Sequence, residues 1–245
     1  MQISIVVPTY NEEKRIGKTI ERIFQFFKKI SDNFEIIVSD DGSQDKTCKI
    51  VKNLKSKYKD LILLENKHLG KGMTVKAGMA EARGELVLFT DADLATPIEE
   101  FSKLKKEFAK GADVVVGSRG LKREGAPIIR YVLSWGFNFL VRVLLGLNFS
   151  DTNCGFKAFR KQALEKILPK LKLYSATYEI SGSRVSASFD LELLYVAKKL
   201  KLKIREVKVL WYHKASKAVR PVVESLLTFI DIFKIRFNDL VGKYG

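Results

Sequence analysis

The amino-acid sequence predicts an α/β fold built on a doubly wound, mostly parallel sheet, with amphipathic helices toward the C-terminus. Short β-branched runs alternate with segments of helical periodicity through the first half of the chain. Most of these runs have apolar residues in consecutive positions, as expected of strands that helices cover on both faces. Acidic residues follow two of the runs, and ligands of such sheets bind at the carboxyl ends of strands.

Each predicted element has its own local signal. Short apolar runs bounded by turn-forming or acidic residues predict strands, which lie at residues 3–7, 34–39, 61–64, 85–90, 113–117 and 204–211. Apolar residues at helical spacing predict helices, which lie at residues 16–27, 45–58, 73–82, 98–110, 131–147, 185–198 and 222–241. No linker or repeat interrupts the chain, so we expect one domain over residues 1–221 and a helical extension over 222–245.

The composition excludes several classes of protein. The chain has 245 residues, of which 46% are apolar, so it can bury a sizeable core and wholesale disorder is excluded. Two cysteines and two histidines argue against a disulfide scaffold and against a Cys/His zinc site. No long uncharged apolar run occurs and no secretory signal begins the chain, so we expect an intracellular protein without a membrane-spanning helix.

The chain carries an excess of positive charge, because 44 Lys and Arg against 28 Asp and Glu give a formal net charge of +16. Such an excess suits nucleic acid, the anionic face of a membrane, or a solvated lysine-rich surface. The aromatic residues are mostly Phe at apolar positions and are not interleaved with Arg, so no nucleic-acid partner is expected. The apolar segment 131–147 is either a buried helix or a helix that lies in the membrane interface.

Asp91-Ala92-Asp93 is the sharpest chemical feature of the sequence. Two carboxylates two residues apart, directly after an apolar strand, can hold one hard cation such as Mg²⁺ or Mn²⁺. A solvated turn is the plain alternative for such a triplet. The preceding strand favours a metal site, because ending a buried strand in two acids costs desolvation unless a cation or hydrogen-bond donors lie there.

Two further motifs lie at the ends of predicted elements. Asp40-Asp41-Gly42-Ser43 repeats the acidic pattern after a strand, although Asp-Gly and Gly-Ser are also common in turns. Gly70-Lys71-Gly72 leads into a predicted helix, and its backbone N–H groups could cradle a phosphate. The second motif lacks P-loop spacing, so ATPase or GTPase chemistry is not supported, and a surface loop is the alternative.

Taken together, the motifs resemble a known family. Val6-Val7-Pro8-Thr9-Tyr10-Asn11-Glu12, Val38-Ser39-Asp40-Asp41-Gly42-Ser43 and Asp91-Ala92-Asp93 resemble the inverting family 2 glycosyltransferases, which have a GT-A fold. Asp151-Thr152-Asn153-Cys154-Gly155-Phe156-Lys157, Phe189-Asp190-Leu191-Glu192-Leu193-Leu194 and Ser216-Lys217 resemble its dolichyl-phosphate β-glucosyltransferase branch, with dolichol-phosphate mannose synthases as the nearest rival. The resemblance spans about residues 3–241, nearly the whole chain.

The resemblance implies a role for individual residues of this chain. The nucleotide-sugar pocket would be lined by Pro8, Tyr10, Glu12, Asp40, Asp41, Lys71, Asp91 and Arg119, with Asp41 and Asp40 on the base. The divalent metal, Mg²⁺ or Mn²⁺, would be held by Asp91 and Asp93 and would bridge the nucleotide diphosphate. The acceptor phosphate would be bound by Arg130 and Lys217. The catalytic residues would be Asp93, Arg119, Asp190 and Lys217.

Asp190 occupies the position at which related transferases keep a catalytic acid. A phosphate acceptor is already an anion and needs no strong base, so Asp190 either acts as a base or orients a basic neighbour. The sequence departs from the family at Ala215, where glycine usually precedes the Ser-Lys pair, and this affects the turn around Lys217. The segment 174–188 is longer and more polar than usual and lacks a typical Trp, so it bears on which sugar is used.

The resemblance implies transfer of a sugar, with glucose favoured, from UDP-glucose to a polyprenyl or dolichyl phosphate in one inverting displacement. The positive charge and the apolar, basic helices at 131–147 and 222–241 suit peripheral binding to the anionic cytoplasmic face of a membrane. One alternative is mannosyl transfer from GDP-mannose. Another is a soluble transferase that acts on a glycan, with its basic helices packed inward or forming a homo-oligomer. A nucleic-acid binder that keeps the fold is the third, and the intact acids argue against it.

Overall fold

The structure is a computed structural model that describes residues 2–31, 33–119, 136–137, 139–173, 188–212 and 221–244, with backbone alone for 221–227. The strands are β1 (Ile3–Thr9), β2 (Phe34–Asp40), β3 (Leu61–Glu65), β4 (Leu86–Thr90), β5 (Val114–Ser118), β6 (Phe156–Arg160) and β7 (Ile204–Lys208). The helices are α1 (Ile16–Ile30), α2 (Thr47–Leu54), α3 (Lys71–Glu81), α4 (Phe101–Ala109), α6 (Lys161–Ile167), α7 (Ser188–Lys199) and α8 (Pro221–Leu240). Short helical turns are η1 (Ile98–Glu100), η2 (Val141–Leu145) and η3 (Leu168–Lys170).

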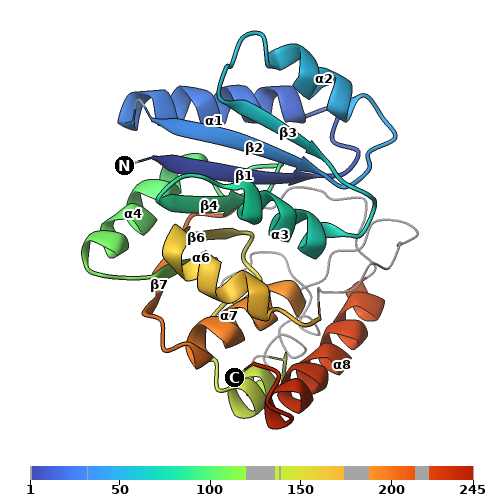
Figure 1. Ribbon diagram of the computed structural model, residues 1–245, viewed down its shortest axis with the longest axis vertical. Helices are drawn as coiled ribbons and strands as arrows, with labels where there is room; N and C mark the ends of the chain where they lie inside the picture. The colour runs from blue at the N-terminus through green and yellow to red at the C-terminus, as the bar shows by residue number, and fades with distance from the viewer. Residues whose placement is uncertain are drawn as a thin grey trace.

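The strands form one sheet in the order β3-β2-β1-β4-β6-β5-β7 (Figure 1). β3, β2, β1 and β4 run parallel to one another, and β5 pairs in parallel with β7. β6 is antiparallel to both of its neighbours, β4 and β5. The predicted α/β fold with a doubly wound, mostly parallel sheet is confirmed, with one reversed strand inside it.

Two apolar cores cover the two faces of the sheet. Side chains of α1, α2 and α4 pack on one face, whereas α3, α6, α7 and α8 pack on the other. Figure 1 shows α1 and α2 on one side of the sheet and α3, α6 and α7 on the other. Successive residues of β1 face different cores, since Ile5 packs in the first and Val6 in the second. This double burial explains why the strands are apolar in both alternating positions.

The predicted elements agree with the structure to within a few residues at most ends. α3 begins at Lys71 rather than at the predicted Met73, directly after Gly70, which adopts a φ of 87°. The sequence pattern predicts neither β6 nor α6. In β6, the cations Lys157 and Arg160 interrupt residues 156–160, which therefore do not form an apolar run. Of the helix predicted at 131–147, residues 136–137 and 139–147 are described. Residues 136–137 and 139–145 are helical, and the helix ends at Leu145, two residues earlier than predicted.

α8 has one face in the protein and one face in solvent. Ile232 and Ile235 are fully buried in the second core, whereas Phe233 and Phe237 are 48% and 61% exposed. Within the described residues, no helix combines the length and the apolar character that a membrane crossing requires.

Glu192 on α7 is a buried carboxylate that joins three segments. Its Oε1 accepts hydrogen bonds from the backbone N–H groups of Lys172 at 2.7 Å and Leu173 at 2.9 Å, and from the hydroxyl of Tyr244 at 2.7 Å. Among the described residues, its Oε2 is a buried side-chain oxygen without a hydrogen-bond partner. Burial raises the pKa of Glu192, and the hydrogen bonds to the carboxylate oppose this only in part.

We expect the variant Glu192→Gln to gain stability relative to the wild type as the pH rises. A carboxyl whose pKa is higher in the folded chain than in the unfolded chain stabilises the fold at low pH, and this contribution is lost as the pH rises through the raised pKa. Glutamine keeps the accepting oxygen and removes the titration. The difference in unfolding free energy should therefore change by about 1.4 kcal/mol for each unit of pKa shift. Urea unfolding of both proteins at about pH 4 and about pH 8 measures it, and a difference independent of pH would contradict the expectation.

Candidate active site

The candidate site lies at the carboxyl ends of β1, β2 and β4. In Figure 1 the carboxyl ends of β1 and β2 are on the right. The chain runs from β1 outward to β2 and β3 and then returns to β4 on the other side of β1. Ligands of such sheets bind where the strand order reverses in this way. Tyr10 and Glu12 follow β1, Asp41 follows β2, and Asp91 and Asp93 follow β4. The predicted site residues of the first half therefore gather at the expected end of the sheet.

Hydrogen bonds join the loop after β1 to the loop after β2. The backbone N–H of Asn11 donates to Ser43 Oγ at 2.8 Å, and the N–H of Glu12 donates to Thr47 Oγ1 at 2.8 Å. Asn11 adopts a positive φ of 54°, a conformation that asparagine tolerates better than most residues. These contacts fix the two loops that carry the predicted nucleotide pocket relative to each other.

Asp40 closes the turn that follows β2. Its carboxylate accepts hydrogen bonds from the backbone N–H of Ser43 at 2.7 Å, from Ser43 Oγ at 2.6 Å and from Thr9 Oγ1 at 3.0 Å. Asp40 is only 1% exposed. Its contacts are with the chain itself, and contact with a nucleotide base stays a prediction.

Asp41 holds the loop that precedes α3. Its Oδ1 accepts hydrogen bonds from the N–H groups of Leu69 at 2.9 Å and Gly70 at 3.0 Å, and its Oδ2 lies 3.0 Å from His68 Nδ1. The N–H of Gly70, predicted as part of a phosphate cradle, thus donates to a carboxylate of the protein. Gly70 also needs its positive φ for this loop to reach Asp41.

An aromatic pair lies next to Asp41. The rings of Tyr10 and His68 stack with centroids 4.3 Å apart and planes inclined by 11°. Tyr10 is a predicted pocket residue, whereas His68 is not predicted, because a lone histidine in a polar loop carries no pattern. The stack presents a flat aromatic unit beside the carboxylate, a combination that suits a nucleotide base.

Lys71 and Asp91 form an ion pair at the start of α3. Lys71 Nζ lies 2.6 Å from Asp91 Oδ1, and the side chains are 29% and 36% exposed. Desolvation lowers the pKa of Lys71, but the negative charges of Asp91, Asp190 and Asp93 outweigh it and raise the pKa above its ordinary value. Lys71 therefore stays protonated at neutral pH and carries a positive charge within the site.

The turn after β4 holds Asp91 and Asp93 in place. Asp93 Oδ1 accepts a hydrogen bond from the N–H of Ala95 at 2.9 Å, and the carbonyl of Ala92 accepts one from Thr19 Oγ1 of α1 at 2.6 Å. Gly155 packs so closely on Asp91 that a Cβ at this position would collide with the carboxylate. The glycine leaves room for that carboxylate, which a larger residue would displace.

The acidic residues of the site fit a divalent cation in part. Asp91 and Asp93 offer oxygen ligands of the kind that Mg²⁺ and Mn²⁺ prefer, and such ions take further ligands from substrate phosphates and water. Within the described residues, no group of three acidic, histidine or cysteine side chains could hold a metal alone. Burial raises the pKa of the nearby Glu12, and Asp93, Asp45 and Asp91 raise it further against the opposing Arg15. The region therefore concentrates negative charge that a cation would relieve.

Arg119, a predicted phosphate ligand, forms a two-pronged ion pair with Asp151. Its Nε and Nη2 donate to the two carboxylate oxygens at 2.6 and 2.8 Å, and its guanidinium carbon lies 5.6 Å from the centre of the Trp211 ring. Burial disfavours both charges, yet the pair raises the pKa of Arg119 and lowers that of Asp151. The adjacent Cys154 is no thiolate, since burial raises its pKa to about 11.

Asp190, in the first turn of α7, contacts a basic neighbour. Lys157 Nζ of β6 donates to Asp190 Oδ1 at 2.7 Å, and the Lys157 side chain is wholly buried. This contact corresponds to the second of the two alternatives for Asp190, and its role in catalysis stays a prediction. The predicted acceptor ligands Arg130 and Lys217 lie outside the described residues, as do Ala215 and residues 174–187.

The fold is that of the GT-A glycosyltransferases. A solved structure of glucosyl-3-phosphoglycerate synthase from Mycobacterium tuberculosis with UDP matches 96% of this chain and 80% of its own, with a TM-score of 0.70 and 19% identity. A complex of the same enzyme with Mn²⁺, UDP-glucose and phosphoglyceric acid covers the same shares, with a TM-score of 0.68 and 20% identity. The chain belongs to glycosyl transferase family 2, whose model matches residues 4–168, so the predicted family is confirmed and the protein is a glycosyltransferase.

Curated relatives share a more specific name. A dolichyl-phosphate beta-glucosyltransferase of Trichomonas vaginalis is 35% identical over 225 residues, which cover 85% of this chain and 65% of the relative. Proteins of the same name from Drosophila melanogaster and Homo sapiens are 33% and 32% identical, covering 100% and 99% of this chain and 77% of each relative. The chain therefore spans about two thirds to three quarters of the length of these relatives.

Proposed function

We propose that the protein transfers glucose from UDP-glucose to dolichyl phosphate or a related polyprenyl phosphate, with inversion, at a membrane surface. The observation that carries this proposal is the shared name of relatives that are 32–35% identical over most of the chain. The site supports a nucleotide-sugar donor, because an aromatic pair with Asp41 and the acidic pair with Lys71 lie at the same end of the sheet.

Donor binding follows from the charges of the site. Tyr10 with His68 would face the base, and Asp91 and Asp93 would hold Mg²⁺ or Mn²⁺. The metal would neutralise the negative charge that develops on the departing diphosphate. Lys71 supplies a positive charge next to Asp91 that favours the same leaving group.

The acceptor reacts as an anion. Its phosphate oxygen attacks the anomeric carbon from the face opposite the diphosphate, so one displacement inverts the configuration. Because this oxygen is already charged, no strong base has to remove a proton from it. Cations are needed to bring two anions together, and this role is proposed for Arg119, Arg130 and Lys217.

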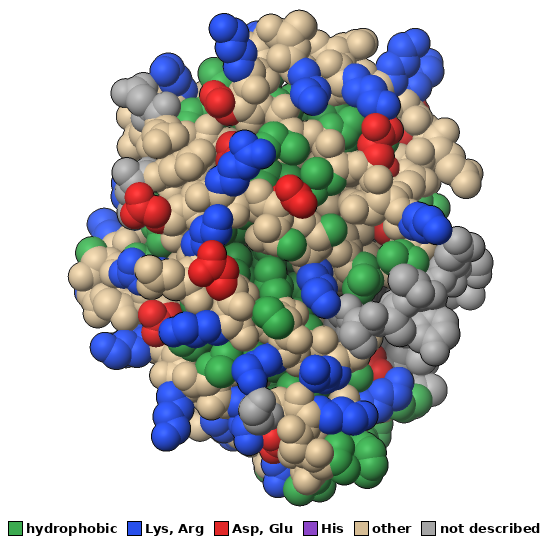
Figure 2. Space-filling model, viewed as in Figure 1, with side chains coloured by type: hydrophobic (Ala, Val, Ile, Leu, Met, Phe, Trp, Pro, Cys, Tyr) green, Lys and Arg blue, Asp and Glu red, His purple; other side chains and the backbone are tan. Residues whose placement is uncertain are grey.

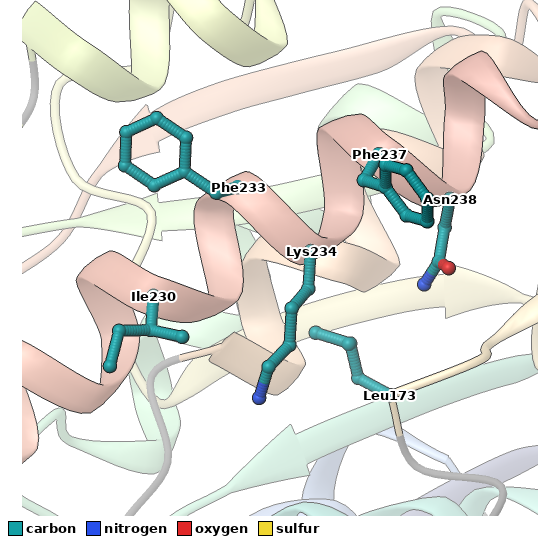
Figure 3. A pocket seen from close by; sticks show the side chains of 6 residues that line it. All are labelled: Leu173, Ile230, Phe233, Lys234, Phe237 and Asn238. Atoms are coloured by element: carbon teal, nitrogen blue, oxygen red, sulfur yellow. The ribbon is translucent and has the colours of Figure 1, made fainter.

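An exposed apolar surface supports action at a membrane. We call the exposed apolar side chains on or next to α8 and η2 the apolar face: Phe139, Val143, Phe229, Ile230, Phe233, Phe237, Leu240 and Val241, each 38–69% exposed. Figure 2 shows hydrophobic side chains at the lower end of the molecule, over α8, with Lys and Arg side chains close by. A cavity of about 340 Å³ opens here between α8 and Leu173, with Ile230, Phe233 and Phe237 around it (Figure 3). An apolar helix face with basic neighbours is typical of helices that lie in the interface of an anionic leaflet, here proposed as the cytoplasmic one.

The proposed reaction is tested by incubating the protein with Mn²⁺, dolichyl phosphate and radiolabelled UDP-glucose, and in parallel with GDP-mannose. Formation of a β-linked glucosyl lipid from UDP-glucose is expected, and the anomer is read by nuclear magnetic resonance. Transfer from GDP-mannose alone would favour the mannosyl alternative. Transfer to a water-soluble glycan with none to the lipid would favour the soluble transferase.

We expect Phe237→Glu to weaken binding to anionic vesicles by about 10-fold or more. Burying one phenylalanine in an apolar environment contributes about 1.5–3 kcal/mol, and glutamate adds repulsion from anionic lipid. Sedimentation with phosphatidylserine-containing vesicles measures the effect. The matched control is Ile30→Glu, which alters an exposed residue at the end of α1, away from the apolar face. Equal sedimentation of the two variants would contradict membrane binding through α8.

A further inference from the structure

Lys157 is a wholly buried lysine to which the resemblance assigns no role. It lies in β6, opposite Phe89 of β4 and Val116 of β5, so the sheet surrounds its backbone on both sides. A buried ammonium group is costly unless charged and polar partners surround it. Its partners are Asp190 Oδ1 at 2.7 Å and the backbone carbonyl of Cys154 at 2.5 Å.

These two partners belong to different parts of the active site. Asp190 lies in the first turn of α7 and is itself the predicted catalytic acid. The carbonyl of Cys154 belongs to the peptide that leads into Gly155, and Gly155 packs directly on the carboxylate of Asp91. A single ammonium group therefore contacts Asp190 itself and, through Cys154, the backbone that confines Asp91.

We infer that Lys157 is a positioning residue that fixes the metal-side carboxylate of Asp91 and the acid Asp190 relative to each other. The inference rests on the proposed function, because it assumes that Asp91 holds a divalent metal with the nucleotide. Removal of Lys157 frees both contacts, whereas the substitution Asp190→Asn leaves the contact with Cys154 in place. Comparing the two variants thus separates the effect of losing the contact with Cys154, next to Asp91, from the effect of losing the contact with Asp190.

The test compares Lys157→Met, Asp190→Asn and the double variant by two measurements. Calorimetry gives the dissociation constant of the Mn²⁺·UDP complex, and steady-state kinetics give kcat for glucosyl transfer. Loss of a residue that orients a metal ligand typically weakens metal binding 10- to 100-fold, so about 10-fold weaker Mn²⁺·UDP binding is expected for Lys157→Met. Asp190→Asn should bind Mn²⁺·UDP as the wild type does. Both single variants should lower kcat, and the double variant should be no slower than Lys157→Met, since Lys157→Met has already released Asp190 from its contact.

The control is Lys161→Met, which removes a partly exposed lysine four residues further along and should change neither quantity. If circular dichroism finds Lys157→Met unfolded, Lys157→Gln replaces it, with the same expected loss of Mn²⁺·UDP affinity. Wild-type affinity in a folded Lys157 variant, or additive losses of kcat in the double variant, would overturn the inference. A wild-type protein that binds no Mn²⁺·UDP would instead contradict the proposed function and, with it, the inference.

Discussion

Replacing Asp93 by asparagine is expected to lower turnover by about 10²- to 10³-fold, because the divalent metal proposed to stabilise the leaving diphosphate loses one of its two carboxylate ligands. Asparagine retains an oxygen that can accept the N–H of Ala95, which Asp93 Oδ1 accepts at 2.9 Å, so the turn after β4 is preserved. What is lost is one of the two carboxylate charges that the proposed divalent metal requires. Steady-state kinetics with UDP-glucose and calorimetric unfolding without metal measure the two effects.

The matched control for this variant is Asp60→Asn, which removes an exposed carboxylate just before β3. It should leave turnover unchanged. The metal-free unfolding temperature of Asp93→Asn should stay close to that of the wild type. Retained activity would remove Asp93 from the metal site, and a large fall in metal-free stability would assign it a structural role instead.

Replacing Gly155 by alanine is expected to reduce turnover by about 10²-fold, as a displacement of reacting groups by about 1 Å does. The added Cβ would collide with the Asp91 carboxylate, so either that side chain or the strand-entry backbone must move. The Asp91 side chain is 36% exposed and can turn outward, so the loss should fall mainly on donor binding and turnover. The free energy of unfolding should fall by about 1–3 kcal/mol, the usual cost of overpacking.

Gly17→Ala provides the comparison for Gly155→Ala. A Cβ at Gly17 of α1 would lie 3.7 Å from Ile50 Cγ2, an ordinary van der Waals contact. Alanine in a helix should stabilise the protein by about 0.5–1 kcal/mol and leave turnover unchanged. Mn²⁺·UDP binding measured on both variants separates a displacement of Asp91 from the general effect of adding a methyl group. Unaltered binding in Gly155→Ala would show that Asp91 accommodates the methyl group.

The parallel part of the sheet could be predicted from the sequence, because strands that are buried on both faces are apolar at most consecutive positions. β6 could not, since its five residues include Lys157 and Arg160, and strand patterns count cations against burial. The buried positive charge of Lys157 is neutralised by Asp190, which lies 33 residues later in the chain. No local window of sequence contains both partners.

Some residues of the candidate site could likewise be predicted from the sequence, and others could not. The acids after β2 and β4 follow from their place at strand ends, which topology alone brings together. The contacts of Asp41 with Gly70 and of Tyr10 with His68 depend on how a loop returns to the sheet. Sequence periodicity does not tell how this loop packs against the sheet, so the place of His68 beside Tyr10 and Asp41 is known only from the structure.

The reversed strand β6 has a consequence for the order in which the chain can fold during synthesis. In the part of the chain that the structure describes, β5 pairs with β6 and β7 alone. Both are made later, so residues 114–118 leave the ribosome before either of these partner strands exists. Until β6 is added, the outer edge of β4 also stays open, which exposes unpaired backbone to other chains. The match to the family model ends at residue 168, just after β6 and α6, and so includes the first strand that can close this edge. A nascent chain that stops before β6 would therefore expose unpaired backbone groups of β4 to other chains. A chain that includes β6 can pair with those groups itself.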